Sequence, residues 1–305
     1  MKSQLSLRDG LLALAVVLVW GTNFVVIRLG LDVLPPLFFA TLRFVFVLLP
    51  ACLFLPRPKV SWANLAFYGL AIGVGQFGLL FIAMNGRISP GLASLVVQMQ
   101  VFFTVALAMW RTGERIKPHQ LAAFALALAG MGVIAVHNGP QNGHSTTILG
   151  LVLVLLAALS WALGNQAGRE ASANGSINML AYVVWAALFA VPPLLALSLL
   201  LEGPAAIMAG LARATPLTWA AVLWQSVGNT MFGYACWAWL LARYPAATVA
   251  PVSLLVPVFG FGASAALLGE PMPPWKIMAT LLIMAGLAVN LLWRPSKNEI
   301  SGEAA

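Results

Sequence analysis

Charged residues are scarce in this sequence. Asp, Glu, Lys and Arg make up 8% of its 305 residues, whereas about 25% is usual for a soluble globular domain. Cysteine is almost absent too: Cys52 and Cys236 both lie in apolar stretches, and the three histidines have no partner at metal-ligand spacing. No disulfide framework and no metal site can be built from them. Hydrophobic residues make up 61% of the chain, which predicts an integral membrane protein without a metal or cofactor.

Acidic residues are missing from the middle of every long apolar stretch. Proton-coupled carriers usually relay protons through buried carboxylates or histidines, so a carboxylate relay is not expected, and facilitated export and exchange both stay open. The same absence argues against a membrane enzyme, which needs convergent nucleophile, base or metal residues. No catalytic residue is predicted. Glu114 and Glu270, at the ends of two apolar stretches, are each predicted to cap the N-terminus of the helix that follows.

Ten apolar stretches approach the roughly 20 residues that a helix needs to cross a bilayer. They are Leu11–Ile27, Leu37–Leu55, Trp62–Ala83, Ala93–Trp110, Leu121–Val136, Ile148–Asn165, Met179–Leu201, Leu217–Leu241, Ala247–Leu268 and Ile277–Trp293. The sequence therefore predicts an all-α membrane protein with ten transmembrane helices. The first stretch is too long for a signal peptide, and no small-residue cleavage site follows it.

The basic residues give the chain a formal net charge of +8. They lie in short loops between apolar stretches, where membrane topology explains them, so no nucleic-acid partner is predicted. With the N-terminus in the cytoplasm, eleven Lys and Arg residues fall in inside segments, and the four in outside segments are Arg28, Arg87, Arg213 and Lys276. Both termini are therefore predicted to be cytoplasmic.

One pattern occurs twice in the chain. Its landmarks are Gly113-Glu114, Pro118 and Ala129-Gly130 in the first half, and Gly269-Glu270, Pro274 and Ala285-Gly286 in the second. Repeats of this size in a hydrophobic chain are typical of duplicated transporters. Because each half holds five helices, the second enters the membrane from the opposite side, and the repeat is inverted. The first predicted five-helix repeat covers residues 8–138, and the second covers residues 148–293. Residues 139–147 are predicted to form an extracytoplasmic linker loop between them, and residues 294–305 a cytoplasmic tail.

Ten helices in two inverted halves, with Gly-Glu after the fourth helix of each, resemble the EamA-like branch of the drug/metabolite transporter superfamily over about residues 8–293. Four stretches resemble the bacterial exporters of O-acetylserine and cysteine in particular: residues 20–27, 91–96, 98–104 and 250–258. The resemblance implies an inner-membrane protein that exports such small metabolites by alternating access through a central cavity. The alternative is a broader exporter that also carries aromatic and other neutral amino acids. The implied partners are a small-molecule substrate and membrane lipid, and the implied state is a monomer or weak dimer.

Polar and aromatic side chains inside the helices are the candidates for substrate binding, because a polar group in hydrocarbon costs free energy unless it faces a cavity or a partner. Lining a cavity, they would hold a zwitterion by hydrogen bonds and stacking; the alternative is hydrogen bonding that only joins helices. The predicted substrate-binding residues are Trp20, Asn23, Gln76, Gln98, Trp161, Asn165, Trp185, Trp224, Gln225, Asn229, Tyr234 and Ser253. Gln98 is preferred to Gln100 because the two point about 200° apart on a helix.

Arg43 is the single basic residue inside a predicted helix, about 10 Å from the outer end at helical rise. It could pair with a substrate carboxylate, or it could extend to the surface or bond the backbone carbonyls of a neighbouring helix. An Arg-Phe pair here also resembles a general feature of the family, whatever the substrate. A structural role is therefore favoured for Arg43.

Glycine and proline predict where helices pack closely and where they bend. Gly69 and Gly73 form a small-residue face suited to close helix contact. Pro251 and Pro257 interrupt the ninth helix at positions where the first repeat has no proline. Because proline lacks an N–H and kinks a helix, the ninth helix is the predicted hinge.

Overall fold

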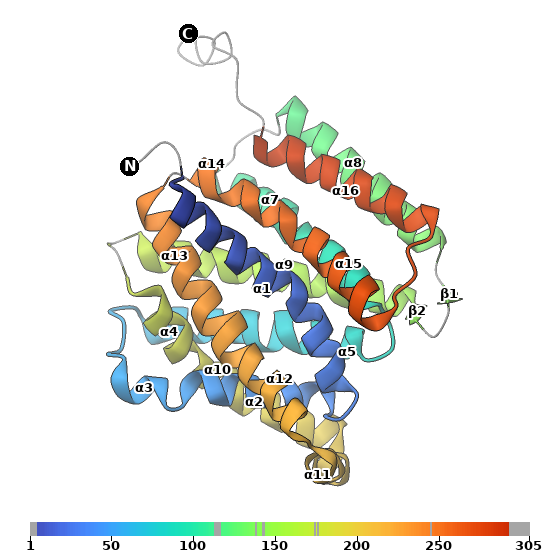
Figure 1. Ribbon diagram of the computed structural model, residues 1–305. Helices are drawn as coiled ribbons and strands as arrows, with labels where there is room; N and C mark the ends of the chain where they lie inside the picture. Colours follow the sequence, from blue (N-terminus) through green and yellow to red (C-terminus); the bar gives the residue numbers. More distant parts are fainter. Residues whose placement is uncertain are drawn as a thin grey trace.

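The computed structural model is a bundle of helices (Figure 1). It describes residues 5–112, 117–137, 139–141, 144–173, 175, 177–244 and 246–292. Gly113, Glu114 and the predicted tail therefore lie outside the described residues. Within them, every regular element except one short hairpin is helical. The predicted all-α membrane fold is confirmed.

Five transmembrane helices form the first repeat, and three of them are built from more than one segment. The segments are α1 (Leu7–Leu31), α2 (Pro36–Leu48), α3 (Ala51–Phe54), α4 (Trp62–Gly69), η1 (Leu70–Gly78), α5 (Leu79–Met84), α6 (Pro90–Val96), η2 (Val97–Met99), α7 (Gln100–Thr112) and α8 (Pro118–Val136). The second helix joins α2 and α3, the third joins α4, η1 and α5, and the fourth joins α6, η2 and α7.

The second repeat follows the same order with one addition. Its segments are α9 (Ile148–Ser172), α10 (Met179–Leu201), α11 (Gly203–Arg213), α12 (Pro216–Leu223), η3 (Trp224–Phe232), α13 (Gly233–Arg243), α14 (Ala246–Val249), η4 (Ala250–Leu254), α15 (Leu255–Leu268) and α16 (Pro274–Leu292). The addition is α11, which begins at Gly203 with a left-handed φ of +83° and is bent by 109° from the helix that follows. The sequence predicted only a loop here, because α11 is too short to span a bilayer.

Nine helices among the described residues are long and apolar enough to cross a membrane, and the bent pair of α11 with residues 216–240 brings the number to ten. The eighth helix is the least apolar because its middle segment, η3, is polar. The linker also differs from the predicted loop: β1 (Gly139–Gln141) and β2 (His144–Thr146) form an antiparallel hairpin.

Contacts between helices recur in matched pairs across the two halves. α1 packs on η3 and α15, and its counterpart α9 packs on η1 and α7. α8 and α16 pack side by side at one edge of the bundle (Figure 1). Their glycines correspond: a Cβ on Gly130 would lie 3.0 Å from the carbonyl oxygen of Ala279, and one on Gly286 would lie 2.6 Å from that of Ala123. The halves are thus related by an approximate two-fold axis, as expected for an inverted repeat.

The start of α1 and the end of α16 lie on the same side of the molecule (Figure 1). That this side is cytoplasmic is a prediction, which cysteine labelling tests. In a background without Cys52 and Cys236, an impermeant thiol reagent on intact cells should label a cysteine at Asn85, after α5, but not one at Ala173, after α9. Both positions are exposed, and both should react after permeabilisation. Labelling of Ala173 alone from outside would reverse the orientation.

Matching helices in the two repeats are interrupted in matching ways. The third helix of each repeat contains a nine-residue π-helical segment, η1 or η3. The fourth helix of each contains a 3₁₀ segment, η2 or η4. The π-helix is rare and occurs mostly at functional sites. The segments η1, η2 and η3 interrupt their helices midway, where a substrate site would be expected, whereas η4 begins the ninth helix at Ala250.

Two carboxylates join the repeats at the end of the bundle away from the termini. Glu202, after α10, accepts hydrogen bonds from the backbone N–H groups of Leu37 (2.6 Å) and Phe38 (3.0 Å) at the start of α2. A carboxylate suits a helix N-terminus because it satisfies free N–H groups and matches the helix dipole. The second repeat thus holds a helix end of the first.

Glu270 is the second of these carboxylates. It was predicted to cap the following helix, but it caps α6 of the other repeat, accepting from the N–H of Gly91 at 2.9 Å. Lys276 (2.8 Å), Ser89 and Ser264 complete its shell, and Glu270 and Lys276 are each 3% exposed. Burial would raise the pKa of Glu270, but hydrogen bonds from Lys276, Ser264 and Ser89 hold it below its ordinary value.

Close packing at Gly69 and Gly73 is confirmed. A Cβ on Gly69 would lie 2.2 Å from the carbonyl oxygen of Ala186, and one on Gly73 would lie 2.3 Å from the Cβ of Ala190. Both distances are below any ordinary contact, so only glycine lets α10 approach the third helix this closely.

Candidate functional site

A buried polar cluster joins the two repeats around Arg43, on α2. The Arg43 side chain is fully buried. Its Nη1 donates to Oε1 of Gln225 at 2.8 Å and its Nη2 to Oγ1 of Thr230 at 2.7 Å, both on η3. Gln225 Nε2 in turn donates to Oδ1 of Asn23, on α1, at 2.7 Å. We call Arg43, Asn23, Gln225 and Thr230 the Arg43 cluster.

The π-helical geometry of η3 explains why Gln225 and Thr230 meet the same guanidinium. On an α-helix, residues five apart point about 140° away from each other. The wider turn brings them onto one face, and Thr230 Oγ1 donates to the carbonyl of Gln225 at 2.8 Å. Thr230 was not predicted from the sequence, because an α-helical period turns it away from Gln225. The one available signal was the polar run within η3.

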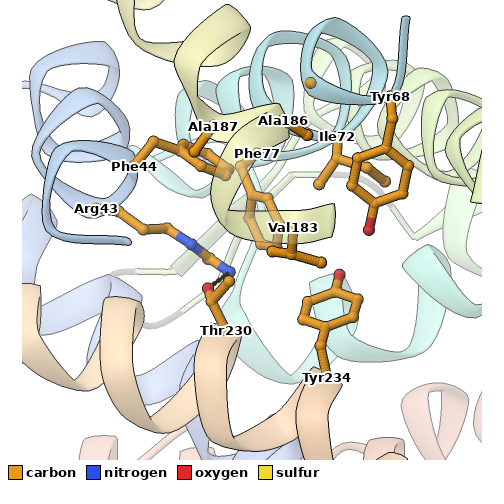
Figure 2. A pocket seen from close by; sticks show the side chains of 11 residues that line it. Arg43, Phe44, Tyr68, Ile72, Phe77, Val183, Ala186, Ala187, Thr230 and Tyr234 are labelled. Atoms are coloured by element: carbon orange, nitrogen blue, oxygen red, sulfur yellow. Dashed lines mark hydrogen bonds between the residues drawn. The ribbon is translucent and has the colours of Figure 1, made fainter. Parts of the chain in front are cut away.

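Aromatic rings cover the guanidinium of Arg43. Its Cζ lies 3.5 Å from the ring centroid of Phe77 and 5.5 Å from that of Phe44, within the range of cation–π attraction. A small cavity begins at this point, and Figure 2 shows the hydroxyl groups of Tyr68 and Tyr234 pointing toward each other across it. The cavity has room for about one water molecule. The cavity is therefore closed around its polar groups.

Trp20 forms the adjoining wall. Its Nε1 donates to the carbonyl of Asn229 at 3.2 Å, and its ring centroid lies 6.0 Å from that of Tyr234 and 5.2 Å from that of Trp237. A Cβ on Gly233 would lie 2.3 Å from Trp20 Nε1, so the glycine leaves room for the indole. Five of the predicted residues are thus brought together: Trp20, Asn23, Gln225, Asn229 and Tyr234.

Two other predicted residues form a contact of their own between the repeats. Gln98, in η2, donates through Nε2 to the carbonyl oxygen of Ser253, in η4, at 3.3 Å. Pro257 lies four residues after Ser253 and has no N–H to give that carbonyl. Gln98 therefore supplies a donor that the proline cannot. Whether Gln98 also lines a cavity in another conformation stays a prediction.

The remaining predicted residues are not brought to the Arg43 cluster. Asn165 donates to Gln100 Oε1 at 3.0 Å, and Trp185 donates to the carbonyl of Leu55 at 3.0 Å, where the second helix ends. Trp224 is 38% exposed on the outside of the bundle. The others are Trp161, half-buried on α9, and Gln76, buried in η1 with no hydrogen-bond partner for Oε1 among the described residues.

A duplicated bundle of nine membrane helices among the described residues, or ten with the bent pair, and a buried polar cluster between its halves are typical of a membrane transporter. The EamA-like transporter family matches residues 9–136 and 148–292. The chain belongs to this family, and it is a multi-pass protein of the bacterial inner membrane.

Relatives match the chain over nearly its whole length. A protein of Salmonella typhimurium is 44% identical over 94% of this chain and 96% of its own, and one of Escherichia coli is 42% identical over 95% and 98%; each is called "Probable amino-acid metabolite efflux pump". A "Probable terminal-alkyne amino-acid exporter" of Streptantibioticus cattleyicolor is 26% identical over 89% of both chains. A protein of known crystal structure, 20% identical, superposes with a TM-score of 0.59 over 93% of this chain and 97% of its own, which supports the fold alone.

Proposed function

We propose that this chain exports amino acids or closely related small metabolites from the bacterial cytoplasm, with O-acetylserine and cysteine as the preferred type. The observation that carries the proposal is the name shared by the two relatives that are 42–44% identical over 94–95% of this chain. The Arg43 cluster supports it, since amide and hydroxyl groups at the repeat interface suit a small zwitterion. It lies where inverted-repeat transporters place their substrate sites.

Transport proceeds by alternating access in this proposal. The closed cavity cannot hold a substrate, so the helices around it must separate on one side at a time. Glu202 and Glu270 hold the repeats together at the end away from the termini. Pro251, in η4, and Pro257, in α15, are the proposed hinge. An outward opening requires the two carboxylates to release the helix ends that they cap.

Efflux from proteoliposomes tests the substrate. Vesicles containing the purified protein are loaded with labelled cysteine, O-acetylserine or phenylalanine, and loss of label is followed with and without a pH gradient. We expect cysteine and O-acetylserine to leave several times faster than from protein-free vesicles, and phenylalanine to leave near the protein-free rate. Equal rates for all three would favour the broader exporter, for which the aromatic lining of the cavity by Tyr68, Phe77 and Tyr234 is the supporting observation. No flux of any amino acid would contradict the proposal.

A further inference from the structure

Arg43 is a buried cation that no carboxylate neutralises among the described residues. It lies within a transmembrane helix, and its side chain is fully buried. The described carboxylates are engaged elsewhere: Asp9 with Tyr244, Asp32 with Arg28, Glu170 with Arg111, Glu202 with the start of α2, and Glu270 with Lys276. The groups that touch the guanidinium are a neutral amide, a neutral hydroxyl and aromatic rings.

The guanidinium also has an unused donor. Nη1 and Nη2 of Arg43 donate to Gln225 and Thr230, whereas its Nε is buried and has no hydrogen-bond partner in the described part of the chain. A buried donor without a partner costs free energy. Arginine presents its donors as a planar fork that fits a carboxylate with two parallel hydrogen bonds. The edge that includes Nε is therefore free for such a pair.

A purely structural role does not explain a full charge at this place. Gln225 already joins η3 to α1 through Asn23, and a neutral side chain on α2 could accept or donate in the same way. A charge inside a membrane protein costs free energy unless it is paired, and such residues are typical of substrate sites. Arg43 also lines the cavity, together with Tyr68, Phe77 and Tyr234 (Figure 2).

We propose that Arg43 binds the carboxylate of the transported molecule, so that the substrate supplies the missing counter-charge. This inference rests on the proposed function and reverses the structural role that the sequence favoured for Arg43. The amide of Gln225 and the hydroxyl of Thr230 position the fork, and Phe77 stacks on its face. The carboxylate approaches the Nε edge when the helices around the cavity separate. The ligand class is a small monocarboxylate, with α-amino acids as the main case.

The test compares a carboxylate with its neutral amide. Calorimetry on the purified protein in nanodiscs measures the affinity for cysteine and for cysteinamide, which share every group except the carboxylate. We expect the wild type to bind cysteine about tenfold to a hundredfold more tightly, as a charge-assisted bidentate contact allows. Equal affinities would overturn the proposal.

Gln225→Glu is the decisive variant because it adds an internal counter-charge without changing shape. Its carboxylate would lie where Oε1 of Gln225 is now, 2.8 Å from Arg43 Nη1, and a flipped Asn23 amide would still donate to it. The expected result is a stable protein in which cysteine binds about tenfold more weakly or worse, while cysteinamide stays within a few-fold. A preference for cysteine as large as in the wild type would overturn the proposal.

Two further variants complete the design. Gln100→Glu adds the same group at the Asn165 contact and should keep the preference for cysteine; losing it there as well would overturn the assignment to Arg43. Arg43→Gln should remove the preference, and if this variant does not fold, the result with Gln225→Glu decides. Weakening of cysteine and cysteinamide by equal factors in a folded Arg43→Gln would also overturn the proposal, because it would indicate a structural role.

Acetate and acetamide separate this inference from the proposed function. In one outcome, cysteine neither binds nor leaves vesicles, the wild type binds acetate more tightly than acetamide, and Gln225→Glu has no such preference. The proposed substrate is then wrong, and the carboxylate site at Arg43 stands. If cysteine is exported but Gln225→Glu keeps its full preference for the carboxylate, the proposed function stands and Arg43 is not the site.

Discussion

Glu270→Gln is expected to lower the free energy of unfolding by about 3–5 kcal/mol, the usual result of removing one partner of a buried ion pair. The substitution keeps the shape of the side chain but leaves Lys276, which is 3% exposed, without its counter-charge. It also weakens the cap on α6, where Gly91 donates to the carboxylate. Chemical denaturation in detergent micelles measures the change.

Two variants control this experiment. Glu170→Gln removes an ion pair with Arg111 in which both side chains are 48% exposed, and it should cost less than about 1 kcal/mol because water screens such pairs. The double variant Glu270→Gln/Lys276→Met should regain much of the lost stability, because no unpaired charge remains. A single Glu270→Gln that is as mild as Glu170→Gln would contradict the argument.

The stabilisation by Glu270 also predicts a pH dependence. Its pKa in the folded protein lies below the ordinary value of 4.5. The unfolded chain therefore takes up a proton at a higher pH than the folded protein does, and folding is favoured while the carboxylate is ionised. This stability should be fully present above about pH 4.5 and should be lost as the pH falls below it. Glu270→Gln should flatten this part of the stability profile.

Gln98→Leu is expected to cost about 0.5–1.5 kcal/mol, because it removes a hydrogen bond to the part-buried carbonyl of Ser253. Pro257→Ala should suppress this loss, since the alanine restores an N–H four residues after Ser253 that can donate to the same carbonyl. The two substitutions should therefore be non-additive in a double-mutant cycle. Gln100→Leu is the matched control and should give the same cost with either residue at position 257. Additive values for Gln98 and Pro257 would contradict the coupling.

Pro257→Ala also tests the hinge. An uninterrupted α-helix bends less easily than one with a proline, so transport should slow severalfold while substrate affinity stays within a few-fold of the wild type. Tryptophan fluorescence gives the affinity and proteoliposome efflux gives the flux. If affinity falls as much as flux, or if flux does not change, the hinge lies elsewhere.

Composition and spacing were enough to predict the helices, because a membrane span needs about 20 apolar residues and leaves few alternatives. The repeat was equally clear from the Gly-Glu, proline and Ala-Gly landmarks. The helix α11 was missed because it spans nothing and carries no comparable length signal. The cap at Gly91 was missed because Glu270 reaches a distant segment rather than the adjacent helix.

The candidate site was harder to predict because residue type does not fix which way a side chain faces. Trp20 and Trp224 both lie within membrane helices, yet one contacts Asn229 and Tyr234 while the other is 38% exposed on the outer surface. Nor does an α-helical period apply to η3, so the meeting of Gln225 and Thr230 at Arg43 needed the three-dimensional fold.

The contact between α8 and α16 has a mechanical consequence. Gly130 and Gly286 change places under the approximate two-fold axis, so this contact maps onto itself. When two inverted repeats exchange conformations, contacts away from the axis take on the geometry of their counterparts, whereas a contact on the axis is the same before and after. In the proposed alternating access, the packing of α8 on α16 would therefore contribute nothing to the free-energy difference between the inward-open and outward-open forms, and the two helices would serve as the frame against which the other helices rock.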